Sequence, residues 1–140
     1  MRTSIDGSIE IDVPDAAAYE FWTRIEDFPR FIGPIESVER IDAVRSRWRV
    51  NFGFRHEEWT AEITEVIPGK RRSWRTVEGS ASAGMVNFHP LPEDRCLMTL
   101  HLDYEPKGVV QNLGDELGIV QRVIQHALEQ FKDFAEAGYS

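Results

Sequence analysis

The chain has 140 residues, with 24 acidic side chains against 16 lysines and arginines, and its formal net charge is -8. This length fits a single domain, 1–140, and the mix of 41% hydrophobic and 29% charged residues excludes a disordered chain. The only cysteine, Cys96, excludes an intramolecular disulfide and a cysteine-rich zinc site. The sequence contains neither a secretory signal nor the ~20 apolar residues of a membrane span, so we expect a cytoplasmic protein.

The first quarter of the chain predicts a strand followed by two short helices. Apolar and polar residues alternate from Ile5 to Val13, which is typical of a half-buried strand. Pro14 ends this strand because proline cannot donate to a ladder, and Asp15 favours a helix start. The residues that then follow helical spacing are Ala18, Phe21, Trp22 and Ile25, and a second short turn covers 27–32.

From residue 35 to residue 104 the hydrophobic period is mostly two. Turn-forming residues interrupt it at 68–70 and 90–94, and 79–84 has the composition of a loop of small residues. Short connections between consecutive strands imply antiparallel hairpins, because parallel strands need long crossovers.

The two central hairpins predict a register for three strands. A turn near 54–57 would place Phe52 opposite Trp59, and the turn at 68–70 would place Ile63 opposite Trp74. Both pairings keep the aromatic side chains on one face. On the other face, Glu62 would then lie between Arg49 and Arg75.

After residue 108 the period becomes 3.6 and predicts one long helix, with an apolar stripe from Val110 to Phe134. Gly114 and Gly118 lie in this stripe, and indicate either a frayed or closely packed first turn or a helix thinned beside a pocket. These elements predict an α+β domain in which the long helix covers the concave face of a curved antiparallel sheet of about six to seven strands.

Several segments in this order carry a resemblance to a known family: 8–14, 18–22, 27–31, 48–50, 59–63, 68–70 with Trp74, 84–88 and 102–106. They resemble the helix-grip fold of the START-like (SRPBCC) superfamily and, within it, the bacterial polyketide cyclase/dehydrase and lipid-transport family. The resemblance covers nearly the whole chain and implies a binding cavity between the sheet and the long helix. Catalytic residues differ between branches of the superfamily, so it carries no catalytic motif and no cofactor onto this chain.

Binding of a small hydrophobic molecule (a lipid, an isoprenoid or a polyketide-like compound) is the function that these features favour. Inward-facing tryptophans are consistent with a cavity wall, although they are equally consistent with a plain core. We expect the cavity to have Phe28, Phe31 and the 79–84 loop at its entrance. The candidate ligand-binding residues are Phe28, Phe31, Trp48, Trp59, Trp74, Thr76, Met85, Tyr104, Leu113 and Leu117.

Two alternatives remain open at this point. A cyclase or dehydratase acting on a polyketide-like substrate would need a hydrogen-bond donor and a proton carrier, for which Tyr104, Arg72 and Thr76 are the polar candidates. A non-catalytic partner-binding or stress-related role, as a monomer or a homodimer, is the other. The four histidines lack metal-ligand spacing, so no metal site is predicted.

Arginines interleave with tryptophans at 45–49 and 71–75, as they do on some nucleic-acid-binding sheets. Strand parity places Trp48 and Trp74 on one face and most of these arginines on the other, which favours a salt-bridged outer face over an anionic partner. We therefore expect no nucleic-acid binding. Arg72 shares the parity of Trp74, and either extends to solvent at the strand end or places its guanidinium at the cavity rim.

Overall fold

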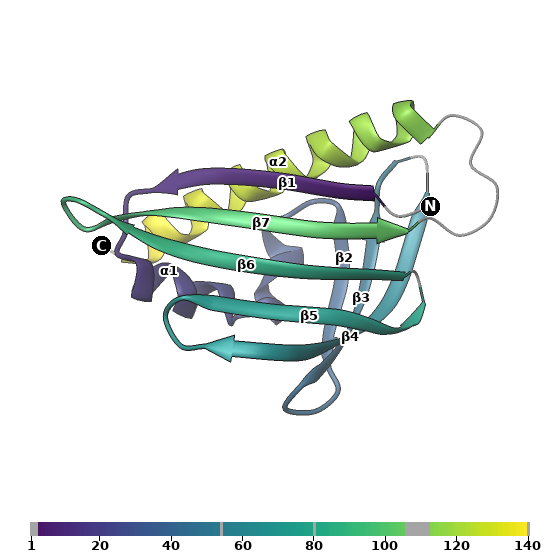
Figure 1. Cartoon of the computed structure of the whole chain (residues 1–140), viewed down its shortest axis with the longest axis horizontal. Coiled ribbons are helices and arrows are strands. Elements are labelled where there is room, and N and C mark those ends of the chain that lie inside the picture. The colour runs from purple at the N-terminus through teal and green to yellow at the C-terminus, as the bar shows by residue number, and fades with distance from the viewer. Residues whose placement is uncertain (1–2, 54, 80, 106–112, 140) are drawn as a thin grey trace.

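The computed structural model describes residues 3–53, 55–79, 81–105 and 113–139, without the side chains of 3, 81–82, 104–105 and 113–116. It contains one antiparallel sheet of seven strands, in the order β1-β7-β6-β5-β4-β3-β2. The strands are β1 (Thr3–Ile11), β2 (Ile35–Arg40), β3 (Arg45–Asn51), β4 (His56–Ile67), β5 (Arg71–Gly79), β6 (Ala81–Leu91) and β7 (Arg95–Glu105). The sheet is curled into a half-barrel, as Figure 1 shows, and this confirms the predicted fold class.

The helices are α1 (Asp15–Trp22), a 3-10 helix η1 (Ile25–Arg30) and α2 (Leu113–Tyr139). The main chain of Pro14 accepts the first helical bond, from Ala18 N at 3.0 Å, so α1 begins after Pro14, as predicted. The strand ends earlier than predicted, because β1 ends at Ile11 and not at Pro14. Pro29 lies inside η1 and supports a tight, short helix instead of a long one. Val110, the first residue of the predicted stripe, lies outside the described residues.

Both edges of the sheet are covered by helices. Helix α2 runs alongside β1 (Figure 1), where the amides of Gln121 and Gln125 donate to the main-chain oxygens of Asp6 and Ser8 at 2.8 and 3.3 Å. At the opposite edge η1 packs against β2, and Arg40 donates to the main-chain oxygen of Thr23 at 2.9 Å. Covering strand edges in this way reduces their tendency to pair with other chains.

The register prediction is right for one hairpin and wrong for the other. Ile63 pairs with Trp74, as predicted, but Trp59 pairs with Trp48 and not with Phe52. The turn comes earlier than expected because Asn51 Oδ1 accepts a bond from Gly53 N at 2.8 Å and Gly53 adopts a φ of 94°. The pairing moves by four residues, an even number, so every side chain keeps its predicted face.

The loop predicted at 79–84 is largely strand. β6 begins at Ala81, and Gly84 pairs with both Trp74 and Leu102. Gly84 has to be small because Trp74 lies across the sheet at this point, so the glycine there reflects packing. The predicted break at Gly79 is confirmed, because β5 ends there and Gly79 adopts a φ of 100°.

The core lies between the inner face of the sheet and α2. Val120, Leu128 and Phe131 of α2 are buried against it, while Leu117 and Ile124 are partly exposed. On the sheet side the core includes Ile11, Val86, Phe88 and Met98, all at most 1% exposed. The helical stripe therefore packs on the sheet, as the periodicity predicts.

A charged cluster on the outer face makes the stability pH-dependent. His101 Nδ1 lies 2.5 Å from Asp6 Oδ1, and its Nε2 lies 3.3 Å from Asp103 Oδ1. Hydrogen bonding to Asp6 raises the pKa of His101 above its ordinary value of 6.5. The protonated ring therefore stabilises the fold fully below the unfolded pKa, and this contribution is lost as the pH rises through the higher folded pKa.

His101→Gln should remove this contribution. Melting temperatures measured from about pH 5 to about pH 9 should fall less with rising pH in this variant than in the unmodified protein. His126→Gln, at an exposed position of α2, is the matched control and should leave the slope unchanged. Parallel curves for His101→Gln and the unmodified protein would contradict the assignment.

Candidate functional site

A cavity of about 210 Å³ lies between the inner face of the sheet, η1 and α2. Its walls are almost wholly apolar. On the helix side they are formed by Val120, Val123, Ile124, Ala127, Leu128 and Phe131. An apolar cavity of roughly 150 Å³ is enough to bind benzene in another protein, so this one has room for a larger apolar molecule.

All four tryptophans of the chain line this cavity. Trp48 and Trp59 stack with centroids 6.1 Å apart and planes at 4°, and Trp22 and Trp74 stack at 6.4 Å. Phe28 joins the two pairs, at 5.3 Å from Trp22 and 6.1 Å from Trp48. Such an aromatic surface suits flat or long apolar ligands, because rings present large rigid contact areas.

Gly84 permits the position of Trp74. A Cβ added at Gly84 would overlap Trp74 Cζ2 and lie 2.5 Å from its Cε2, so any side chain there would displace the indole. The absence of a side chain at Gly84 therefore leaves room for the Trp74 ring, and the position of this ring affects the width of the cavity.

The structure brings together four of the ten candidate ligand-binding residues: Phe28, Trp48, Trp59 and Trp74 line the cavity. Phe28 is 1% exposed, so it forms an interior wall and not the expected entrance. Phe31 lies away from the cavity and stacks on Phe134 at 4.2 Å.

The other candidates do not contribute to the described cavity wall. Met85 faces the outer side of the sheet, because its neighbours Gly84 and Val86 occupy the inward positions. Thr76 and Leu117 are not among the lining residues. The side chains of Tyr104 and Leu113 lie outside the described residues.

The sequence analysis does not identify Trp22, Glu57 or the α2 residues as part of the cavity wall. The sequence pattern places Glu57 in a turn, yet it shares the parity of Trp59 and lines the cavity, with Oε1 3.5 Å from Arg55 Nη1. Helical spacing indicates only a packing role for Trp22, and its position near the start of η1 turns its ring toward Trp74. The signal for Glu57 is present in the sequence as the alternation 57, 59, 61, 63.

Nucleophilic and metal chemistry find little support in the described part of the chain. Burial raises the pKa of the Cys96 thiol to about 11, which keeps it protonated and unreactive at neutral pH. No group of three or more metal-ligating side chains occurs within residues 3–53, 55–79, 81–105 and 113–139. Of the three candidates for proton chemistry, Arg72 alone is among the described residues that line the cavity.

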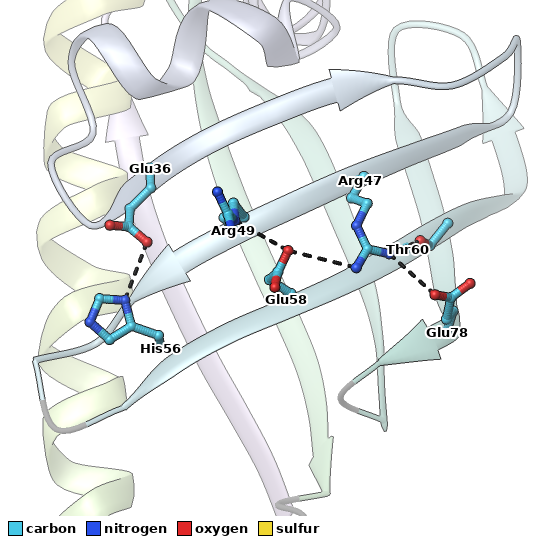
Figure 2. A network of polar contacts seen from close by, with 7 residues as sticks. All are labelled: Glu36, Arg47, Arg49, His56, Glu58, Thr60 and Glu78. Atoms are coloured by element: carbon cyan, nitrogen blue, oxygen red, sulfur yellow. Dashed lines mark hydrogen bonds and ion pairs between the residues drawn. The ribbon is translucent and has the colours of Figure 1, made fainter.

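The arginines on the outer face are bound to carboxylates (Figure 2). Glu58 Oε1 lies 3.2 Å from Arg49 Nε and 3.6 Å from Arg47 Nη2, and Arg47 also reaches Glu78 at 3.5 Å. Glu62 binds Arg75 at 3.1 Å but does not bridge to Arg49, which corrects the predicted charge ladder. The reason is the four-residue shift of the β3–β4 register.

This pairing leads us to expect no binding of labelled DNA or RNA at a physiological salt concentration. Each exposed pair contributes little to stability, but the carboxylates neutralise the charge that phosphate would need. A measurable affinity that falls steeply with added salt would contradict this expectation.

The curled antiparallel sheet with its long C-terminal helix is the START-like fold that the sequence resemblance predicts. Residues 11–133 match the family model described as polyketide cyclase / dehydrase and lipid transport, and the chain belongs to this family. An uncharacterised 17.2 kDa protein of Streptomyces lincolnensis, from the melC2-rnhH intergenic region, is 40% identical over 96% of this chain and 90% of that protein.

Solved structures show the same fold. A protein from Thermus thermophilus aligns with a TM-score of 0.86 and 22% identity over 99% of this chain and 100% of that one. The Zhui aromatase/cyclase from a Streptomyces species aligns at 0.80 with 14% identity, over 97% and 94%. A START superfamily protein from Mycobacterium smegmatis aligns at 0.72 with 15% identity, over 96% and 94%. Among the described helices, none is long and apolar enough to cross a bilayer.

Proposed function

We propose that this protein binds one small hydrophobic molecule, of lipid, isoprenoid or polyketide type, in the cavity between the sheet and α2. The observation that carries the proposal is the concentration of all four tryptophans on the wall of an apolar cavity. A protein that needed only a stable core would fill this space with side chains, because interiors pack closely. Family membership supports the same conclusion.

Binding is favoured over catalysis. Cyclisation or dehydration needs at least two polar groups that converge on the substrate, one to stabilise developing charge and one to move a proton. In the described part of the wall Glu57 is engaged by Arg55, and Asp103 is engaged by His101. The third charged side chain there is Arg72, which makes no ion pair with either carboxylate. The charged groups of the described wall therefore do not form a converging pair.

Native mass spectrometry against a panel of apolar compounds tests the proposal, with tryptophan fluorescence as the second readout. Because every tryptophan lines the cavity, occupation should change the emission and raise the melting temperature. No bound species and unchanged fluorescence across lipid, isoprenoid and aromatic polyketide probes would contradict it.

A further inference from the structure

Arg72 is unusual among the arginines of the sheet. The others each have a carboxylate partner within the described residues: Arg40 with Glu26, Arg45 with Asp42, Arg47 and Arg49 with Glu58, Arg71 with Glu65, Arg75 with Glu62, and Arg95 with Glu10. Arg72 has no ion pair and no side-chain hydrogen bond within that part of the chain. In a chain of net charge -8, carboxylates are abundant, so this exception needs a physical reason.

The position of Arg72 supplies that reason. It pairs with Val66 on β4 and Val86 on β6, shares the inner face with Trp74, and is partly buried on the cavity wall. A cation beside an apolar wall loses part of its hydration, and the loss is uncompensated unless an anion lies nearby. Among the described residues the protein provides no such anion within ion-pair distance.

Two indole N–H groups near Arg72 are also hydrogen-bond donors without an acceptor among the described residues. Trp48 donates its indole N–H to Ser46 Oγ at 2.9 Å, whereas the indole N–H groups of Trp22 and Trp74 find no acceptor within the described residues. Trp74 lies two positions from Arg72 on the same face and stacks on Trp22. The described polar groups without partners at this part of the cavity are therefore all hydrogen-bond donors.

We propose that Arg72 binds the carboxylate of an otherwise apolar ligand, whose hydrocarbon part occupies the tryptophan-lined cavity. The inference rests on the proposed function and specifies the ligand class. Guanidinium is planar and matches a carboxylate with two parallel hydrogen bonds. One cation balances one negative charge, and a phosphate dianion would leave excess charge in an apolar environment, so a monoanion fits best.

Decanoate and 1-decanol form a matched pair of probes, since they share the chain length and differ in the head group. Binding is measured at neutral pH by tryptophan fluorescence and by native mass spectrometry. The unmodified protein should bind decanoate about 10- to 100-fold more tightly than 1-decanol, the range expected for hydrogen bonds to a charged group. Arg72→Gln should abolish this preference, while Arg72→Lys should retain part of it.

Arg75→Gln is the matched control, because Arg75 lies on the same strand, faces outward and binds Glu62. It should preserve the preference for decanoate. Equal binding of decanoate and 1-decanol by the unmodified protein would overturn the role of Arg72 while leaving the proposed function standing, and that comparison needs no variant. Binding of neither probe, nor of any compound in the wider panel, would instead overturn the proposed function itself.

Discussion

Replacing Leu128 with alanine should lower the free energy of unfolding by about 2–5 kcal/mol, the usual range for a buried leucine. Leu128 is 2% exposed, lies at the centre of the α2 stripe, and contacts β1 so closely that its Cδ1 is 2.9 Å from where a Cβ on Gly7 would be. The lost side chain would leave space that joins the existing cavity and cannot collapse fully.

Urea unfolding measures the change. Arg122→Ala, at an exposed position of the same helix without an ion pair in the described residues, is the control and should change stability by less than about 0.5 kcal/mol. A loss below about 1 kcal/mol for Leu128→Ala would mean that the helix does not depend on the sheet for its packing.

Gly84→Ala should impair both stability and ligand binding. The new methyl group would overlap Trp74, and moving the indole would cost about 1–3 kcal/mol and narrow the cavity. We expect at least about a tenfold loss of affinity for apolar probes, equivalent to ~1.4 kcal/mol.

Gly33→Ala is a strict control, because a Cβ there meets nothing within 4 Å. The two variants add the same methyl group, and thermal unfolding and fluorescence titration should separate them clearly. If Gly84→Ala matched Gly33→Ala in both measurements, Trp74 would not set the shape of the cavity.

The sequence predicts which face a residue occupies far better than it predicts which residue lies opposite. Alternation alone places Trp48, Trp59 and Trp74 on the inner face, and this survives the wrong register of the first hairpin because the error is an even number of residues. The register depends on the turn formed by Asn51 and Gly53, a local hydrogen-bonding preference that hydrophobic periodicity does not contain.

The sequence does not predict the cavity-lining residues whose positions depend on how the helices pack against the sheet. Trp22 and Val123 reach the cavity only because α1 and α2 pack across the sheet at a particular angle, and periodicity does not specify that angle. The prediction that Met85 lines the cavity is wrong for a simpler reason. Val86 faces inward, and its neighbour Met85 therefore faces outward, which strand alternation alone would have shown. The segment around Gly84 resembles a loop in the sequence, because small residues occur both in turns and beneath large aromatic rings.

Electron density in the cavity of crystals grown from protein purified from its own host tests the central claim most directly. We expect continuous density for one elongated or flat apolar molecule between the stacked Trp48 and Trp59 rings and the α2 wall at Val123 and Ala127, with an oxygen-bearing end toward Arg72. A cavity filled by rearranged side chains, or one that holds only ordered water even after soaking with apolar compounds, would contradict the account.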